Sequence, residues 1–125
     1  MYNIDEVENM LNEIAEELPE DFFRFLNGGV MLLPETKHHS QGNLFIMGEY
    51  NCRADIGRYI VIYYGSFISA FGHLDRENFI RELKYTLIHE FTHHMEALSG
   101  ERTLEIKDEI DLERYKNKDN KSDNG

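Results

Sequence analysis

Residues 76–98 read RENFIRELKYTLIHEFTHHMEAL and have the most regular apolar spacing in the chain. Apolar side chains recur there every three or four positions, which predicts an amphipathic helix with one buried face. Asp75 precedes the segment as a good N-cap, and Gly100 stands where a C-terminal cap belongs. The expected buried stripe consists of Ile80, Leu83, Leu87, Phe91, Met95 and Leu98.

The same segment contains the pattern His-Glu-x-x-His at residues 89–93. A helix turns by about 100° per residue, so His89 and His93 project from one side, roughly opposite the apolar stripe. Two imidazoles one turn apart can hold a single zinc ion. Glu90 lies between the two faces, where its carboxylate can accept a proton from a metal-bound water. The segment therefore predicts a zinc site with Glu90 as its base.

A catalytic zinc site usually has three protein ligands and an open position for water. The spacing does not identify the third ligand. Glu101 is the preferred candidate because it directly follows the turn at Gly100 and can swing back under the two histidines. The alternatives that stay open are Glu96, Glu105 and Asp108.

The other histidines and two tyrosines have simpler interpretations. His94 lies nearer the apolar face than His89 does, which favours a packing role. One phenol of the pair Tyr63 and Tyr64 must face away from the core; it either packs within the strand or donates a hydrogen bond to an oxyanion beside the metal. Ordinary surface positions are expected for His38, His39 and His73.

The rest of the chain predicts a short series of helices and strands. Residues 4–18 form an amphipathic helix with Asn3 as N-cap and Glu6 as its capping-box partner. Pro19 ends that helix and allows a short one over 20–26. Strands are expected at 30–33, 44–50 and 58–64, the last two as a hairpin, with a connection over 65–74. A charged helical stretch is expected over 103–115.

Length and charge limit the class of protein. With 125 residues and a hydrophobic fraction of 41%, the chain suits one soluble globular domain. A net charge of −11 argues against nucleic acids and anionic membranes as partners, and allows steering of basic substrates as a weaker possibility. Cys52 is the only cysteine, which indicates a reducing, cytoplasmic setting and a spectator thiol.

These elements predict an α+β fold in which a small mixed sheet packs against the N-terminal helix and the motif helix. We expect a single domain over residues 1–116 and a disordered polar tail over 117–125.

Several segments of the chain resemble a bacterial "possible metallopeptidase" family of zincin-like proteins. The resemblance covers about residues 4–105, and its most specific part is LIHEFTHH at 87–94. The other matching segments are NGGVMLLPE at 27–35, GEY at 48–50 and YIVIYYGSF at 59–67. The resemblance implies a minimal zincin-like fold, zinc on His89 and His93, and Glu90 as the base.

The chain departs from that family after the motif. Many relatives look like His-Glu-x-x-His-His-Phe-Gly-x-x-Asp, and the Asp there is a ligand candidate. Here Met95-Glu96 replaces Phe-Gly, and Ser99 stands at the position of the Asp. An insertion of two residues aligns Glu101 with that position.

The leading hypothesis is a zinc-dependent metallopeptidase that acts on a peptide or protein substrate. Zn²⁺ on His89, His93 and Glu101 would lower the pKa of its water, and Glu90 would accept the proton. The alternative is a non-catalytic zinc-binding module for interaction or regulation, since a chain of this length has little material for a deep cleft. A domain without metal is the third possibility. The sequence identifies neither the natural substrate nor the oligomeric state.

Overall fold

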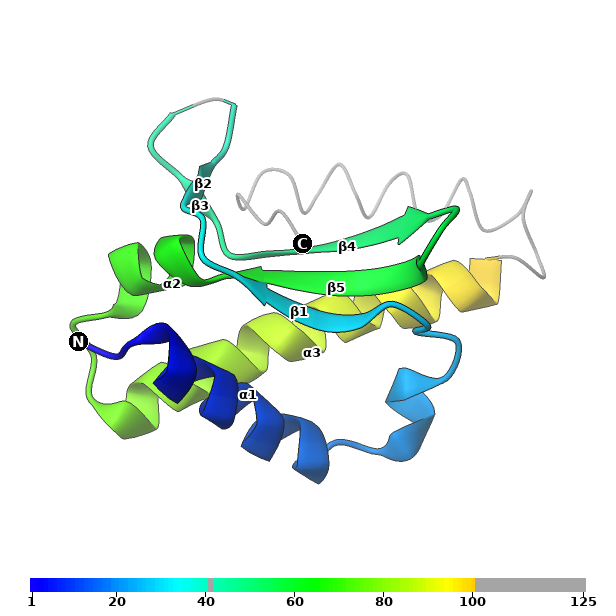
Figure 1. Cartoon of the computed structure of the whole chain (residues 1–125), viewed down its shortest axis with the longest axis horizontal. Helices are drawn as coiled ribbons and strands as arrows, with labels where there is room; N and C mark the ends of the chain where they lie inside the picture. Colours follow the sequence, from blue (N-terminus) through cyan, green and yellow to red (C-terminus); the bar gives the residue numbers. More distant parts are fainter. Residues whose placement is uncertain (41, 101–125) are drawn as a thin grey trace.

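The computed structural model describes residues 1–40 and 42–100 of the chain. The fold is α+β with a small mixed sheet, as the sequence predicted. Figure 1 shows the sheet as one layer, with two long helices beneath it as the second layer. The elements in chain order are α1 (Ile4–Glu17), the 3₁₀ helix η1 (Glu20–Phe23), β1 (Gly29–Leu33), β2 (Lys37–His38), β3 (Phe45–Ile46), β4 (Gly48–Arg53), β5 (Gly57–Tyr63), α2 (Tyr64–Phe71) and α3 (Arg76–Gly100).

The main sheet has the strand order β1-β5-β4. β1 runs parallel to β5, and β4 runs antiparallel to it with Gly48 opposite Ile62 and Arg53 opposite Gly57. β4 and β5 form the predicted hairpin. β5 is consequently central, and its β-branched side chains on one face fill the core, with Ile60 and Ile62 fully buried.

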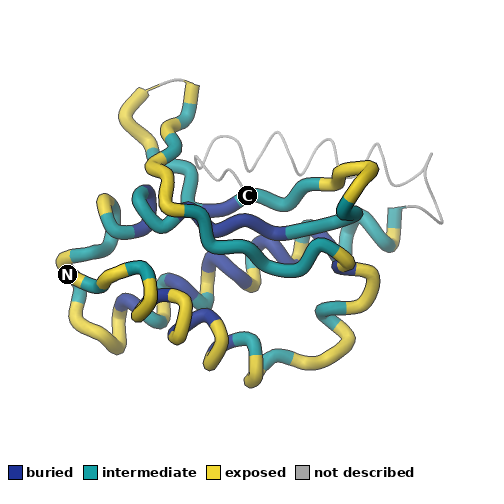
Figure 2. The backbone as a smooth tube through the Cα atoms, in the orientation of Figure 1, coloured by how far each residue is buried: buried dark blue, intermediate teal, exposed yellow. Residues whose placement is uncertain are grey.

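Helices α1 and α3 cover the same face of the sheet (Figure 1). Burial is concentrated where these helices meet the central strands, whereas the outward side of α1 is exposed (Figure 2). The core combines side chains from both helices, β5 and α2, with Val7, Met10, Ile60, Phe67, Phe79 and Leu83 among its members.

Both long helices begin as the sequence predicted. The Asn3 side chain accepts a hydrogen bond from the backbone N–H of Glu6, and the Glu6 side chain accepts one from the backbone N–H of Asn3. Asp75 accepts in the same way from the backbone N–H of Asn78 at 2.9 Å. These bonds satisfy N–H groups that have no partner within the first turn of a helix.

Several predicted elements differ in extent. The expected strand over 44–50 is divided at Met47 into β3 and β4, and β3 pairs with β2 in a second small sheet. The expected helix over 20–26 is only the short η1, and Phe25 then adopts a left-handed backbone with φ of 62°. The expected connection over 65–74 is mostly helix α2, because its Phe67 side chain is buried against Phe79.

The start of α2 clamps the first residue of β2 and the residue before it. The Ser66 hydroxyl accepts a hydrogen bond from the backbone N–H of Lys37 at 2.7 Å and donates one to the Lys37 carbonyl at 3.0 Å. A Cβ on Gly65 would lie 2.2 Å from the Thr36 side-chain oxygen, so only glycine fits there. Gly65 and Ser66 therefore position β2 beside the sheet.

Gly100 lies inside α3 as its last described residue, and not beyond the helix as its expected cap. The expected helix over 103–115, the domain limit at 116 and the tail over 117–125 lie outside the described residues. Within residues 1–40 and 42–100, the structure contains no helix long and apolar enough to cross a membrane.

Candidate metal centre

The two motif histidines meet on the surface of α3. Their Nε2 atoms are 3.0 Å apart, and their ring centroids are 4.6 Å apart with the rings nearly perpendicular. Both residues are partly exposed. Two imidazole ligands of one tetrahedral zinc ion, with Zn–N bonds of about 2.0–2.1 Å, would lie roughly 3.3 Å apart. The pair therefore fits a shared zinc ion after a small adjustment of the rings.

Glu96 stands at the other ring nitrogen of His93. Its Oε1 is 3.5 Å from His93 Nδ1, and its side chain keeps 24% of its exposure. A carboxylate at Nδ1 favours the tautomer with hydrogen on Nδ1, which leaves Nε2 as a lone-pair donor. This position suits an orienting residue better than a metal ligand, because Nε2 and Nδ1 point in different directions from the ring.

Glu90 is fully buried between α3 and β4. Gly48 at the start of β4 is its neighbour: a Cβ built on Gly48 would be 3.4 Å from Glu90 Cγ. The predicted position of Glu90 between the His face and the apolar face agrees with this contact. The missing side chain at Gly48 makes room for the carboxylate stem against the strand.

The third ligand is not settled by the described residues. Within them, no group of three or more His, Cys, Asp or Glu side chains could hold a metal ion. The preferred candidate Glu101 and the alternatives Glu105 and Asp108 lie outside the described residues. Among the candidates, only Glu96 is described, and it faces the far nitrogen of His93.

His94 is a buried core residue, as its predicted position near the apolar face implied. Its Nε2 is 2.7 Å from the carbonyl oxygen of Arg24, which can only accept, so Nε2 carries the hydrogen. Its Nδ1 lies 2.7 Å from the hydroxyl of Tyr50, which in turn accepts a hydrogen bond from Arg58 at 3.3 Å. With the ring neutral, Tyr50 donates to Nδ1 and every group has a partner.

This network ties α3 to β4 and to the segment after η1. The sequence predicted no pairing partner for His94, because Tyr50 and Arg24 are far from it along the chain. Alternation along β4 was the available signal: Gly48 and Tyr50 share one face of the strand, and both contact α3. β4 therefore runs alongside α3, with Gly48 level with Glu90 and Tyr50 level with His94.

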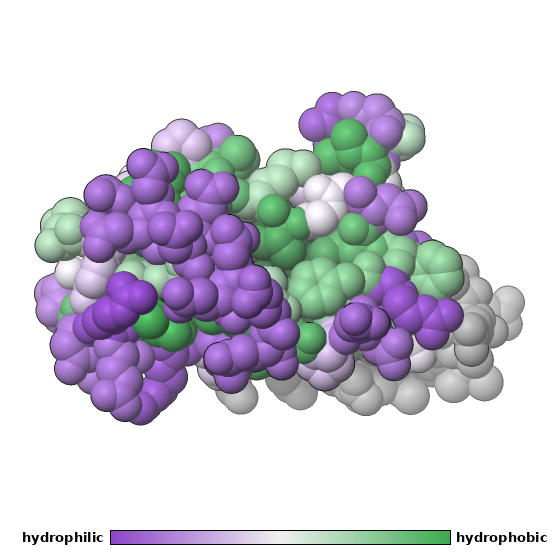
Figure 3. Space-filling view, turned by 60° about the horizontal axis from the view of Figure 1, so that its bottom comes forward, coloured by the Kyte–Doolittle hydropathy of each residue, from purple (hydrophilic) through white to green (hydrophobic). Residues whose placement is uncertain are grey.

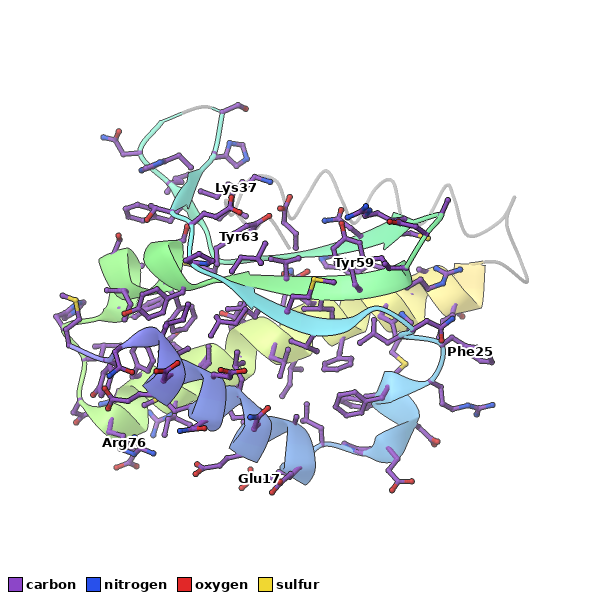
Figure 4. All side chains as sticks on the ribbon, in the orientation of Figure 1. Glu17, Phe25, Lys37, Tyr59, Tyr63 and Arg76 are labelled. Carbon is purple, nitrogen blue, oxygen red and sulfur yellow. The ribbon has the colours of Figure 1, made fainter. Side chains whose placement is uncertain are left out.

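A second polar cluster lies at the end of β5 and consists of Lys37, Glu49 and Tyr63. Lys37 donates to Glu49 at 2.7 Å and to the Tyr63 hydroxyl at 3.4 Å, and Tyr63 donates to the same carboxylate. Lys37 and Tyr63 lie on the side of the sheet away from α3 (Figure 4). Glu49 belongs to that side too, because it alternates with Gly48 and Tyr50.

The cluster shifts two pKa values upward. The hydrogen bond to the Glu49 carboxylate raises the pKa of Lys37, with a smaller opposing effect of burial. Burial and then the hydrogen bond to Glu49 raise the pKa of Tyr63. Both groups are therefore held in their protonated forms, and the cluster acts as a clamp between β2, β4 and β5.

Neither tyrosine phenol is directed to the histidine pair. Tyr63 belongs to the cluster with Glu49, and the Tyr64 hydroxyl donates to the backbone carbonyl of Tyr2 at 2.6 Å. The predicted alternative of a phenol at the oxyanion is therefore wrong for both. Cys52 is exposed on β4, which agrees with a spectator thiol.

The arrangement combines three chemical parts in one place. The Nε2 atoms of two imidazoles converge at the surface of α3, a buried carboxylate follows at the next position of the helix, and β4 runs beside α3. Among the described strands, β4 is an edge of the main sheet and pairs only with β5. The described residues therefore bring together two imidazoles of the three protein ligands that a catalytic zinc site usually has.

Comparison with known proteins gives one informative relative. No family model matches the chain, and no curated protein does. A solved structure described as a conserved hypothetical protein from Thermo thermophilus is similar, with 34% sequence identity and a TM-score of 0.69. The match covers 79% of this chain and 99% of that one. The chain therefore belongs to the same protein family as that conserved hypothetical protein.

Proposed function

We propose that this protein is a zinc-dependent metallopeptidase with a minimal zincin-like fold. One observation carries the proposal: the Nε2 atoms of His89 and His93 converge to 3.0 Å beside the buried Glu90. The two nitrogens lie at hydrogen-bond distance from each other, and the same placement brings both rings close to the positions of two imidazole ligands on one zinc ion. The proposed setting is the cytoplasm, with a peptide or protein as substrate.

The donor set is one that zinc accepts. His89 and His93 would supply neutral imidazole nitrogens, and Glu101 is the proposed third ligand. Zinc bound there would polarise a substrate carbonyl and lower the pKa of a water molecule. Glu96, whose Oε1 is 3.5 Å from Nδ1 of His93, would orient that ring so that its Nε2 could bind zinc.

Glu90 is the proposed base. It follows His89 directly in α3, and the contact with Gly48 fixes its stem. In the reaction its carboxylate accepts the proton of the attacking water and returns it to the leaving amine.

β4 offers a place for the peptide. Its outer edge has backbone N–H and C=O groups that face away from β5, and it runs alongside the motif turn of α3. An extended peptide that adds to this edge would lie next to His89 and His93. Backbone pairing of this kind binds peptides with little dependence on their side chains.

A non-catalytic zinc-binding module is the second candidate. The full burial of Glu90 favours it, because a base must reach the water that it deprotonates. In this case Glu90 would serve packing against β4, and zinc would only fix the end of α3.

Zinc content and turnover distinguish these functions. Protein purified without added metal is analysed for zinc, together with a variant that carries His89→Ala and His93→Ala. Both zinc functions predict about one zinc per chain in the wild type and loss of zinc from the variant. Zinc retained by that variant would dismiss the site.

Turnover is then measured on a peptide library, with Glu90→Gln as the matched variant of equal size. The peptidase predicts normal zinc content and a rate reduced by at least about 100-fold in Glu90→Gln. Cleavage at equal rates by both proteins would remove Glu90 from its role. Stoichiometric zinc without any cleavage that depends on Glu90 would favour the binding module.

A further inference from the structure

The histidine face of α3 continues toward the amino end of the helix beyond the motif. Glu82 lies seven residues before His89, which is nearly two full turns, so its direction differs by only about 20°. Tyr85 lies four residues before His89 and about 40° to one side. Both side chains therefore belong to the surface on which the proposed zinc ligands lie. Along the helix axis, Tyr85 is roughly 6 Å and Glu82 roughly 10 Å from His89.

Tyr85 is unusual on this surface because it is large and exposed. It keeps 69% of its exposure, whereas most large apolar and aromatic residues of the described chain are at least partly buried. An aromatic ring next to a candidate active site offers both an apolar surface and a π-face that attracts cations.

The basic residues around Glu82 are directed to other carboxylates. Arg81 is directed to Glu77, 3.8 Å away, and Lys84 to Glu17, 3.7 Å away. No ion pair of Glu82 occurs among residues 1–40 and 42–100. Glu82 is partly buried, which strengthens the field of its carboxylate relative to a fully solvated one.

We propose that Glu82 and Tyr85 form a subsite for a basic side chain of the peptide substrate. This inference rests on the proposed function for the location of the substrate. The carboxylate pairs with a Lys or Arg head group, and the Tyr85 ring covers its stem or its cation. The net charge of −11 adds a general attraction for such peptides.

The helix geometry also gives the position of the basic residue. An extended peptide advances about 3.3 Å per residue, so distances of roughly 6–10 Å correspond to two or three residues from the scissile bond. Gly48 is the first residue of β4, so a peptide that pairs with β4 reaches this part of α3 only with residues that extend beyond the Gly48 end of the strand. The basic side chain therefore belongs to that extending part of the peptide.

Figure 3 shows one face of the protein coloured by the hydropathy of its residues. That view has a large hydrophilic area next to a smaller gathering of hydrophobic side chains. The chain as a whole has 24 acidic residues against 13 Lys and Arg residues, so its net charge attracts cations in general. A test of the subsite must therefore separate local binding from the attraction of the whole molecule.

The test is binding of short peptides, measured by two-dimensional NMR on ¹⁵N-labelled protein. The background is Glu90→Gln, which cannot cleave the peptides if the proposed function holds. Capped peptides carry Lys, norleucine or Glu at one central position in alanine. Titrations are run with added Zn²⁺ and with a chelator at about 0.15 M salt, which limits long-range attraction.

We expect the Lys peptide to bind roughly three- to tenfold tighter than the norleucine peptide and to shift amides near Glu82 and Tyr85. Glu82→Gln and Tyr85→Leu should each reduce this preference about threefold. Glu13→Gln removes one equal charge from the exposed side of α1 and should leave the preference unchanged. The preference should persist under chelation, because neither residue depends on zinc.

Two outcomes would overturn the subsite: equal binding of the Lys and norleucine peptides, or a Lys preference that survives the combined Glu82→Gln and Tyr85→Leu substitutions. The subsite would also be dismissed if Glu13→Gln lowered the Lys preference as much as Glu82→Gln does, because the preference would then come from general charge attraction. Failure of the proposed function is distinguishable from failure of the subsite. In that case the wild type cleaves no peptide, but the Lys peptide still binds more tightly than the norleucine peptide.

Discussion

Gly48 on β4 and Glu90 on α3 face each other so closely that a Cβ on Gly48 would lie 3.4 Å from Glu90 Cγ. The same Cβ would lie 3.0 Å from the carbonyl oxygen of Val61 and 3.2 Å from Cδ1 of Ile62. The two approaches to Val61 and Ile62 of β5 are the tight ones, whereas the approach to Glu90 is an ordinary van der Waals contact. Crowding within the sheet therefore favours glycine at position 48, and Glu90 packs directly against it.

Gly48→Ala should consequently disturb both stability and the proposed base. We expect a loss of about 1–3 kcal/mol in the free energy of unfolding, because one added methyl group overfills the contact. Urea unfolding measures this loss. Gly100→Ala is the matched control, since no atom of residues 1–40 and 42–100 lies within 4 Å of its added Cβ. Equal stability of the wild type and Gly48→Ala would show that Val61 and Ile62 can give way to the added methyl group.

Substitution by Leu should have different effects at the neighbouring residues His93 and His94: loss of zinc binding at His93 and loss of stability at His94. His94→Leu leaves the carbonyl of Arg24 and the hydroxyl of Tyr50 without their buried partner, which should cost about 2–4 kcal/mol of stability. His93→Leu should cost less than about 1 kcal/mol in the presence of a chelator but abolish zinc binding. Unfolding in urea and zinc analysis of both variants are the measurements. Zinc loss from a folded His94→Leu protein would contradict the separation of their roles.

The third ligand can be identified by comparing carboxylate variants. Glu101→Gln should remove most of the zinc affinity, whereas Glu96→Gln should weaken it by about 10- to 100-fold, as expected for an orienting residue. Competition with a fluorescent zinc chelator measures both affinities. Glu105→Gln and Asp108→Asn test the remaining alternatives. The reverse order of effects for Glu101 and Glu96 would move the ligand role to Glu96.

The cluster of Lys37, Glu49 and Tyr63 predicts a loss of stability at alkaline pH. Both the Lys37 and the Tyr63 pKa are raised in the folded state, so folding favours the protonated forms. Their contribution is complete below about pH 10 and decreases as the pH rises through the folded-state pKa values.

Urea unfolding between about pH 8 and pH 11.5, with roughly half-unit steps, measures this decrease. Tyr63→Phe should flatten part of the slope, because it removes one of the two groups. Tyr64→Phe removes a phenol that donates to a backbone carbonyl and should keep the slope. A wild-type stability that does not change over this range would contradict the coupling within the cluster.

Local patterns predicted a good part of this fold. The capping box at Asn3 and Glu6 and the cap at Asp75 involve residues three apart, so the sequence contains both partners. The strongly β-branched run became the central strand β5, since such a run needs burial on both sides. The division of the strand at Met47 was not predictable, because it depends on the pairing of β3 with β2.

The sequence by itself determined the helix α3 and the shared direction of His89 and His93, because helical periodicity fixes the angle between residues four apart. Tertiary structure alone decided the contacts of the polar side chains in the interior. Glu90 packs against Gly48, and His94 lies between Tyr50 and Arg24. Tyr63 forms a cluster with Lys37 and Glu49. These partners come from separate segments, and they meet only after hydrophobic burial has placed the sheet on α3. Periodicity contains no information on such contacts between distant residues.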